Sequence, residues 1–509
     1  MENMKDYLTI KDRIELRSLF SNPTQVDSLP NYDKGMSTRK LCIVAILASW
    51  VLCIFLLLLG SIPSVYINRI ASLVTWTPQL LVFESLLLNL TITLCLEALG
   101  FVHSISLRWG LWHEGRLAYN SNLRLLSSTK FRTSVANTAL VNLFGAVSLV
   151  ICYAGASQIF LDAGDIDKDA DATLIVVTNQ YALIVTGIGI GVQALIATMV
   201  ICAPKHILTW SSNPLNTTLA CMSTGKLERR PGRSLFAAGA LVSAEGCAVV
   251  QSKQCSLGQT DRSTRHIIRF LWTTTSFALL WAVIVLVISQ LDLNSGDGDA
   301  VQGPTLTLGN VSIDTGLTIS GGYQVMLSSC FTIMICVIQA FVTMATHSAE
   351  VIINRVRDED VWRQAYAHDK GTHFSTSSIK TAMTSWQYLA LSTLKPLVHW
   401  MFSLSIRLTN YDGLVVIELG YLPEFLLFVL GVALACLIMG IARSSPKGVQ
   451  PASWGHLQTL ADLVDDWGTA DDKTLFWGDK GVHEDGVRFA GTSAVVGEVG
   501  KIRETAVYR

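Results

Sequence analysis

The feature that most constrains this chain is a series of apolar stretches, each about as long as a lipid bilayer is thick. A helix needs about 20 predominantly apolar residues to cross the hydrocarbon core. The first stretch, Leu41–Ile62, is an unbroken apolar run of this kind, and similar stretches recur as far as residue 442. We therefore predict an all-α fold, a polytopic transmembrane helix bundle that ends in a short soluble C-terminal tail.

The composition agrees with a lipid-embedded chain. Only 15% of the 509 residues are charged and 50% are hydrophobic, whereas soluble domains carry about 25% charged residues. The formal net charge of -1 argues against a nucleic-acid partner, which requires a basic face. The eleven cysteines include no CxxC pair and no Cys/His spacing of a zinc site, so we predict reduced or buried thiols and no cofactor.

The hydropathy pattern divides the chain into three parts. Residues 1–40 are polar and lack the apolar core of a cleaved signal peptide, which predicts a flexible cytosolic N-terminal tail. A transmembrane region follows over residues 41–442, and a C-terminal tail covers 443–509. The predicted spans are 41–62, 79–100, 135–161, 173–202, 267–290, 323–345, 386–407 and 422–442.

The loop charges predict the orientation. The loops 63–78, 162–172 and 291–322 hold two cations among them, Arg69 and Lys168, whereas the alternate loops and the N-terminal tail are rich in Lys and Arg. Positive loops face the cytosol, so we predict six spans up to residue 345 and a cytosolic N-terminus. We expect a membrane of the secretory pathway, the plasma membrane, with an N-glycan at the outer-loop sequon that begins at Asn310.

The stretch Trp386–Arg407 decides the span count. It is apolar but contains Lys395, Pro396 and His399. If it crosses the membrane, the flanking charges match the loop pattern, giving eight spans and a cytosolic C-terminal tail, which we favour. If it lies on or dips into the membrane, there are seven spans and an outer tail.

Ionisable residues inside the predicted spans suggest a polar intramembrane site. Lys395 and His399 are four residues apart, so on a helix they share a face and could line a polar cavity; snorkelling at the interface would explain the same residues. Glu84 and Glu97 lie in the second span. Either both reach the interface, or Glu84 faces other helices and pairs with a cation such as Lys395. The candidate site is therefore Glu84, Lys395 and His399.

The C-terminal tail has a dense pattern of aromatic, glycine and acidic residues. We predict a short amphipathic helix over Gln458–Trp467, with apolar residues along one face. Phe476 and Trp477 could pack on that face or on the membrane surface. The candidate tail motif consists of His456, Asp462, Asp466, Trp467 and Trp477.

The same tail could in principle hold a metal ion or act as an acid and base. The candidate groups are His456, Asp462, Asp465, Asp466, Asp479 and His483. No HExxH pattern fixes them in ligand geometry, and capping and turn roles explain the aspartates more simply. We therefore predict no catalytic, cofactor or metal site, and a protein that is not an enzyme.

Several short sequence motifs resemble those of one group of proteins. They are LKPLVHW (Leu394–Trp400), PASWGHLQTLADLVDDW (Pro451–Trp467), LFWGDK (Leu475–Lys480) and GVRFAGTS (Gly486–Ser493). In these words the chain resembles uncharacterised multi-pass integral membrane proteins of filamentous fungi. The resemblance covers the last quarter of the chain specifically, and it implies a fungal source and a membrane architecture but no reaction.

These observations lead to two main functional hypotheses. The first is an integral membrane scaffold or sensor that works through its cytosolic loops and tail, with the tail motif as a docking surface for cytosolic proteins. The alternative is a transporter or channel whose polar pathway includes Glu84, Lys395 and His399, although no inverted repeat supports it strongly. A membrane enzyme that uses the His and Asp residues of the tail ranks last.

Overall fold

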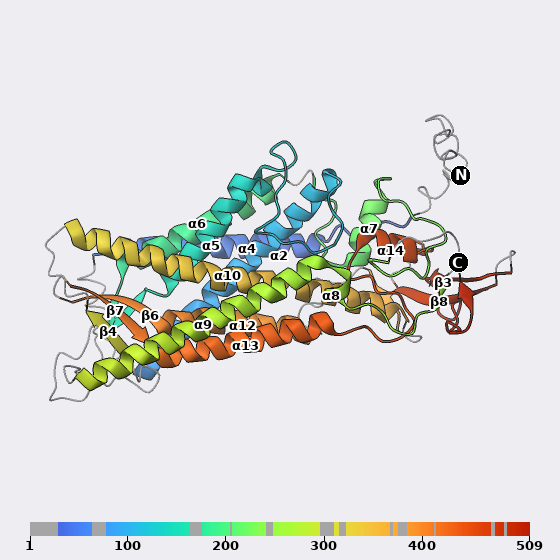
Figure 1. Ribbon diagram of the computed structural model, residues 1–509. Coiled ribbons are helices and arrows are strands. Elements are labelled where there is room, and N and C mark those ends of the chain that lie inside the picture. The colour runs from blue at the N-terminus through green and yellow to red at the C-terminus, as the bar shows by residue number, and fades with distance from the viewer. Residues whose placement is uncertain are drawn as a thin grey trace, which may run out of the picture.

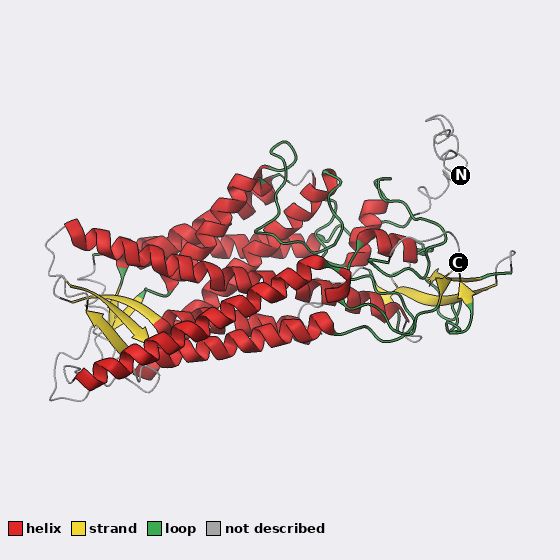
Figure 2. Ribbon diagram, viewed as in Figure 1, coloured by secondary structure: helices red, strands yellow, loops and turns green. Residues whose placement is uncertain are grey.

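The computed structural model of the chain describes residues 29–63, 78–162, 176–203, 206–240, 248–295, 310–314, 322–366, 370–374, 384–411, 414–469, 474–482 and 486–508. Long helices run side by side along the molecule, and a region of short helices, loops and strands lies at one end (Figures 1 and 2). Most of the predicted N-terminal tail lies outside the described residues.

In the described part of the chain, eight long helices form the bundle. They are α2 (Met36–Ser61), α4 (Pro78–His113), α5 (Ala139–Ala156), α6 (Gln180–Cys202), α9 (Arg262–Ser295), α10 (Gly322–Arg363), α12 (Trp386–Ser405) and α13 (Tyr421–Arg443). Within the described residues, seven helices are long and apolar enough to cross a membrane, and α12 is not among them. Large apolar side chains face outward, as do Val51 and Leu58 of α2, which are 68% and 65% exposed. The predicted helical bundle is confirmed, while the span count stays a prediction.

Small residues let α2 and α6 approach closely. A Cβ added at Gly187 would lie 3.1 Å from the Leu57 side chain, and one at Gly191 would lie 3.0 Å from Cys53 Sγ. A larger side chain at either position would force its neighbour to shift, and neighbouring helices in a membrane gain stability from close packing. The segment Gly187–Gly191 of α6 is thus a helix-packing surface.

Strands correct the all-α prediction. Three sheets are present in the described chain. The first pairs β1 (Phe160–Asp162) with β2 (Val176–Thr178), and the second has the order β4-β7-β6, with β4 (Asn310–Asp314), β7 (Leu414–Gly420) and β6 (Ile406–Tyr411). The third has five strands in the order β3-β10-β9-β8-β5, which are β3 (Ala248–Val249), β10 (Val507–Tyr508), β9 (Arg488–Ser493), β8 (Thr474–Val482) and β5 (Thr372–His373). Two predicted spans, 135–161 and 386–407, therefore end early. The seventh span was predicted to run to Arg407, but α12 ends at Ser405, where antiparallel pairing of Ile406 with Leu419 begins.

Two helices extend far beyond the predicted spans. Helix α4 continues to His113 and α10 continues to Arg363, followed by the 3-10 turn η4 (Gln364–Tyr366). The extension of α10 holds the segment after α13, because Glu359 Oε2 accepts hydrogen bonds from the backbone N–H of Ser453 (2.7 Å) and Trp454 (2.8 Å). Another 3-10 turn, η2 (Val135–Asn137), precedes α5.

These extensions enter a folded unit that we call the tail domain. It combines the five-stranded sheet with α7 (Pro214–Met222), α8 (Leu257–Thr260) and α14 (Leu457–Leu463). All nine residues of α7 are buried, although they lie between two predicted spans. The predicted tail helix exists but ends at Leu463, with its apolar face inside the core.

The chain enters and leaves the bundle at the same end. Asp33 donates its backbone N–H to Asn216 Oδ1 (2.8 Å), and the Trp210 N–H donates to the Lys34 carbonyl (3.0 Å), so the start of α2 is fixed to the tail domain. The end of α13 leads into the same domain, and β4, β6 and β7 lie at the opposite end (Figure 1). The chain therefore passes along the bundle an even number of times, with α12 as one pass.

This geometry predicts where N-glycans can form. Arg503→Asn creates an Asn-Glu-Thr sequon at an exposed tail-domain position, and Phe131→Asn creates Asn-Arg-Thr at a side chain that is 71% exposed. We expect neither variant to gain glycosidase-sensitive mass, because both positions would face the cytosol. Native Asn310, removed by Asn310→Gln, is the positive control. A glycan at position 503 would place the tail domain on the lumenal side and contradict eight spans.

Candidate functional site

The candidate site is an ion cluster that joins three helices. Lys395 of α12 lies 2.7 Å from Glu97 Oε1 of α4 and 2.9 Å from Glu350 Oε2 of α10, measured from Nζ. The lysine side chain is 2% exposed, and the two carboxylates retain 22% and 28% exposure. A buried ammonium is costly unless it is paired and hydrogen-bonded, and here two carboxylates satisfy it.

His399 extends the cluster by one helical turn. Its Nδ1 lies 2.6 Å from Gln339 Nε2 of α10, and its ring stacks on Tyr153 of α5 with centroids 3.6 Å apart and planes 3° apart. Lys395 and His399 are both 2% exposed. The predicted shared face of this pair therefore points into the bundle.

Several polar atoms in this region have no hydrogen-bond partner within the described chain. They are Thr93 Oγ1, Tyr153 Oη, Gln339 Oε1, His347 Nε2 and His399 Nε2. A buried polar group left unsatisfied costs about 1–3 kcal/mol, and native cores contain few of them. Ordered water or a ligand commonly satisfies such atoms, so they add hydrogen-bonding capacity beside the ion cluster.

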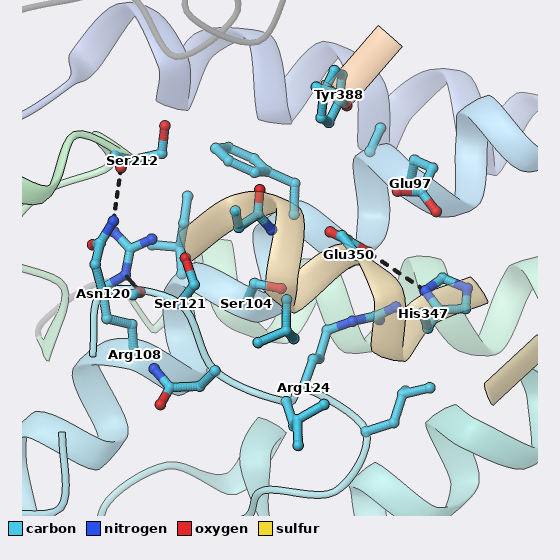
Figure 3. A pocket seen from close by; sticks show the side chains of 18 of the residues that line it. Glu97, Ser104, Arg108, Asn120, Ser121, Arg124, Ser212, His347, Glu350 and Tyr388 are labelled. Atoms are coloured by element: carbon cyan, nitrogen blue, oxygen red, sulfur yellow. Dashed lines mark hydrogen bonds and ion pairs between the residues drawn. The ribbon is translucent and has the colours of Figure 1, made fainter. Parts of the chain in front are cut away.

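A cavity of about 290 Å³ adjoins the cluster. Residues of α2, α4, α10 and α12 and of the segment 120–126 line it. Figure 3 shows Glu97, Glu350 and His347 toward one side and Arg108, Asn120 and Ser212 toward the other. The cavity thus connects two polar regions within the helix bundle.

Three side chains of the cluster come close to the geometry of a metal site. Ligand atoms of Glu97, His347 and Glu350 all lie within 4.8 Å of one another. The Lys395 ammonium, however, already bonds to both carboxylates, and a metal ion would have to displace it. We therefore assign no metal to this cluster.

The structure corrects the predicted partner of Lys395. Glu97, not Glu84, lies beside it. The two glutamates are 13 residues apart on α4, which places them about 20 Å apart along the helix axis. Sequence reasoning also missed Glu350, His347 and Gln339, since nothing in local spacing connects α10 with α12.

The tail-motif residues have structural roles. His456 caps α14, because its Nδ1 accepts a hydrogen bond from the Thr459 backbone N–H. Asp462 lies 2.6 Å from Arg230 Nη2, and Asp466 Oδ1 accepts from the Gly468 N–H. The predicted capping and turn roles of the aspartates are thus confirmed for Asp466, whereas Asp462 joins α14 to the Arg230 loop.

The tail tryptophans belong to the core of the tail domain. Trp467 is 4% exposed and Trp477 is 1% exposed, and Trp477 packs edge-on against Trp362 of α10. Their side chains are buried within this chain and do not form an exposed docking surface. His483 lies outside the described residues. Of Asn310 the structure gives only the backbone position at the start of β4, opposite Gly420.

Comparison with protein-family models, curated proteins and solved structures gave no match. The resemblance of the tail words to fungal membrane proteins therefore stays a prediction.

The ion cluster makes a prediction about stability. Replacing Lys395 with Met leaves two carboxylates without their cation, so we expect the free energy of unfolding to fall by about 3 kcal/mol. Adding Glu350→Gln to this variant should restore part of the loss. Unfolding in mixed detergent micelles measures both effects, with exposed Lys130→Met as the control. Equal stability of Lys395→Met and wild type would show that the cluster contributes nothing.

His456 makes a prediction about pH. Burial lowers the pKa of His456 below its ordinary value, and nearby Arg230 lowers it further. The unfolded chain then binds a proton at a higher pH than the native state, so stability is lost as the pH falls below about 6.5. His456→Asn keeps a helix cap but cannot titrate. The thermal unfolding midpoint should fall less between pH 7 and pH 5 in this variant, and parallel curves would contradict the prediction.

Proposed function

We propose that this protein is a membrane transporter for a small solute, with the Glu97–Lys395–Glu350 cluster as the proton-sensitive part of its pathway. The observation that carries this proposal is a buried ion cluster between three helices, in direct contact with a cavity in the bundle. Ionisable groups inside membrane bundles are costly and commonly mark substrate pathways or proton relays.

The cluster has the chemistry of a switch. Protonation of either carboxylate weakens its attraction to the Lys395 ammonium and thus loosens the attachment of α12 to α4 or α10. His347 Nδ1 lies 3.6 Å from Glu350 Oε2 and offers a second group that can exchange a proton there. Proton binding and helix movement are thereby coupled through the same atoms.

Eight spans belong to the proposal, with the N-terminus and the tail domain in the cytosol and the protein in the plasma membrane. The common position of the start of α2 and the end of α13 supports an even number of crossings. Helix α12 supplies the eighth. Its polar residues need no contact with lipid because Lys395 and His399 bind neighbouring helices.

The scaffold hypothesis has less support. It used Asp462, Trp467 and Trp477 as docking residues, but each is at most 4% exposed. Cytosolic protein partners would have to bind another surface of the tail domain. The geometry therefore favours the transporter hypothesis, with Glu97 in place of Glu84.

The test is solute-driven proton movement in liposomes that contain the purified protein and the internal pH dye pyranine. Inorganic phosphate, succinate, glutamate, choline and glucose are added in turn. We expect at least one to change the internal pH through wild-type protein, and His347→Gln to abolish the response because glutamine cannot exchange a proton. Exposed His113→Gln is the matched control and should respond normally. No response in wild type, or a normal response in His347→Gln, would overturn the proposal.

A further inference from the structure

The cavity beside the ion cluster has a positively charged wall. Arg108 of α4, Arg124 of the following loop and Arg357 of α10 all line it. The ion pairs that arginines form within the described chain involve Arg116, Arg230, Arg355, Arg363 and Arg488. The three cavity arginines therefore have no carboxylate within 4.0 Å in the part of the chain that the structure describes.

Arg108 is held in place by neutral groups. Its Nε donates to the Asn120 carbonyl (2.9 Å), and its Nη1 donates to the Ser211 carbonyl (2.8 Å) and to Thr217 Oγ1 (3.4 Å). The side chain is 6% exposed. These contacts position the guanidinium without neutralising it.

Arg124 has the guanidinium that is best placed to bind a ligand. It is 9% exposed, and within the described chain its guanidinium has no hydrogen-bond acceptor. It lies so close to α4 that a Cβ added at Gly100 would be 2.9 Å from Nη2. Figure 3 shows Arg124 among the polar side chains of the cavity. An arginine presents five N–H donors in a fork that matches carboxylate and phosphate groups.

The charges around the cavity do not balance. Four cations stand against three carboxylates: Arg108, Arg124, Arg357 and Lys395 against Glu97, Glu350 and Asp358. Asp358 is 1% exposed and accepts hydrogen bonds from Asn120 and Ser121, so it lies behind the wall. One positive charge therefore remains without a counterpart among the described residues around the cavity. Figure 3 shows the Arg124 side chain reaching toward His347, on the side of the cavity where Glu350 lies.

We propose that this cavity binds the carboxylate or phosphate group of a small anion, with the Arg124 guanidinium as its main contact. The inference rests on the proposed transport function and names its substrate class. The Coulomb field of Arg108 and Arg357 adds to the attraction. Asn354 of the lining provides a further N–H donor.

Two sources could supply this group. The lining also includes Leu41, Leu94 and Leu126, which are 44%, 58% and 67% exposed. These leucines suit the acyl chains of a phospholipid whose headgroup enters the cavity, and basic pockets between transmembrane helices bind anionic headgroups. The shared chemistry is the anionic group, and the experiment separates a free solute from a lipid.

The experiment measures the thermal unfolding midpoint of the full-length protein in a neutral detergent. Sodium phosphate, sodium succinate and short-chain phosphatidylglycerol are titrated, against sodium chloride and short-chain phosphatidylcholine at matched concentrations. We expect a saturable rise with an anion. A rise with phosphate or succinate identifies a free solute, and a rise with phosphatidylglycerol alone identifies a headgroup. No anion-specific rise would overturn the inference.

Variants of Arg124 test the assigned contact. Arg124→Gln should weaken anion binding roughly tenfold or more, because a charge-assisted pair is lost. Arg124→Lys keeps the charge but not the fork and should lie between this variant and wild type, which covers the case that the glutamine variant fails to fold. Exposed Arg132→Gln in the same loop is the matched control. Unchanged binding in Arg124→Lys and Arg124→Gln would overturn the assignment.

The outcomes for transport and for binding can be told apart. Anion binding without proton movement in liposomes would leave the anion site in place and remove the transport function. Proton movement driven only by choline or glucose, together with no anion binding, would support the transport function and remove the anion site.

Discussion

The pairing of one buried ammonium with two carboxylates holds together segments that are almost 300 residues apart in the chain. Lys395 needs Glu97 and Glu350 because an unpaired charge in the interior of a bundle costs several kcal/mol. The dependence is mutual, since both glutamates would otherwise stand unpaired next to the cavity. Helix α12 is not among the helices apolar enough to cross a membrane by themselves. It is held in the bundle by these two ion pairs and by the stacking of His399 on Tyr153.

Much of the bundle could be predicted from the sequence, because a helix in a membrane is specified by a local property. Runs such as 41–62 and 422–442 contain the information for α2 and α13, and the four-residue spacing of Lys395 and His399 correctly placed both on one inward face. The partners of these two residues could not be predicted from the sequence. Whether Glu84 or Glu97 meets Lys395 depends on how α4 is rotated and shifted against α12, and no periodicity within either segment records that.

The tail domain shows the same limit more strongly. The sequence indicated a short helix near residue 460, but strands of two residues such as β3, β5 and β10 have no period to detect. The need for a glycine at position 455 also becomes clear only from the three-dimensional structure. A Cβ at Gly455 would lie 2.6 Å from the Asp358 carboxylate, which belongs to a helix almost 100 residues earlier. The aromatic and glycine residues of the tail predicted only a short helix, and not the sheet or the elements against which that helix folds.

The composition of the tail domain also has a consequence for how the protein is made. Its parts come from before α2, from the segments between later helices and from the strands after α13. During synthesis they therefore emerge from the ribosome at different times, with helices of the bundle made in between. Trp362 and Trp109 emerge long before Trp477, which joins them in one core. Closure of this core requires that the intervening helices have packed into the bundle in the correct direction. A chain with one inverted helix would leave these tryptophans uncovered, as an exposed apolar surface that favours aggregation.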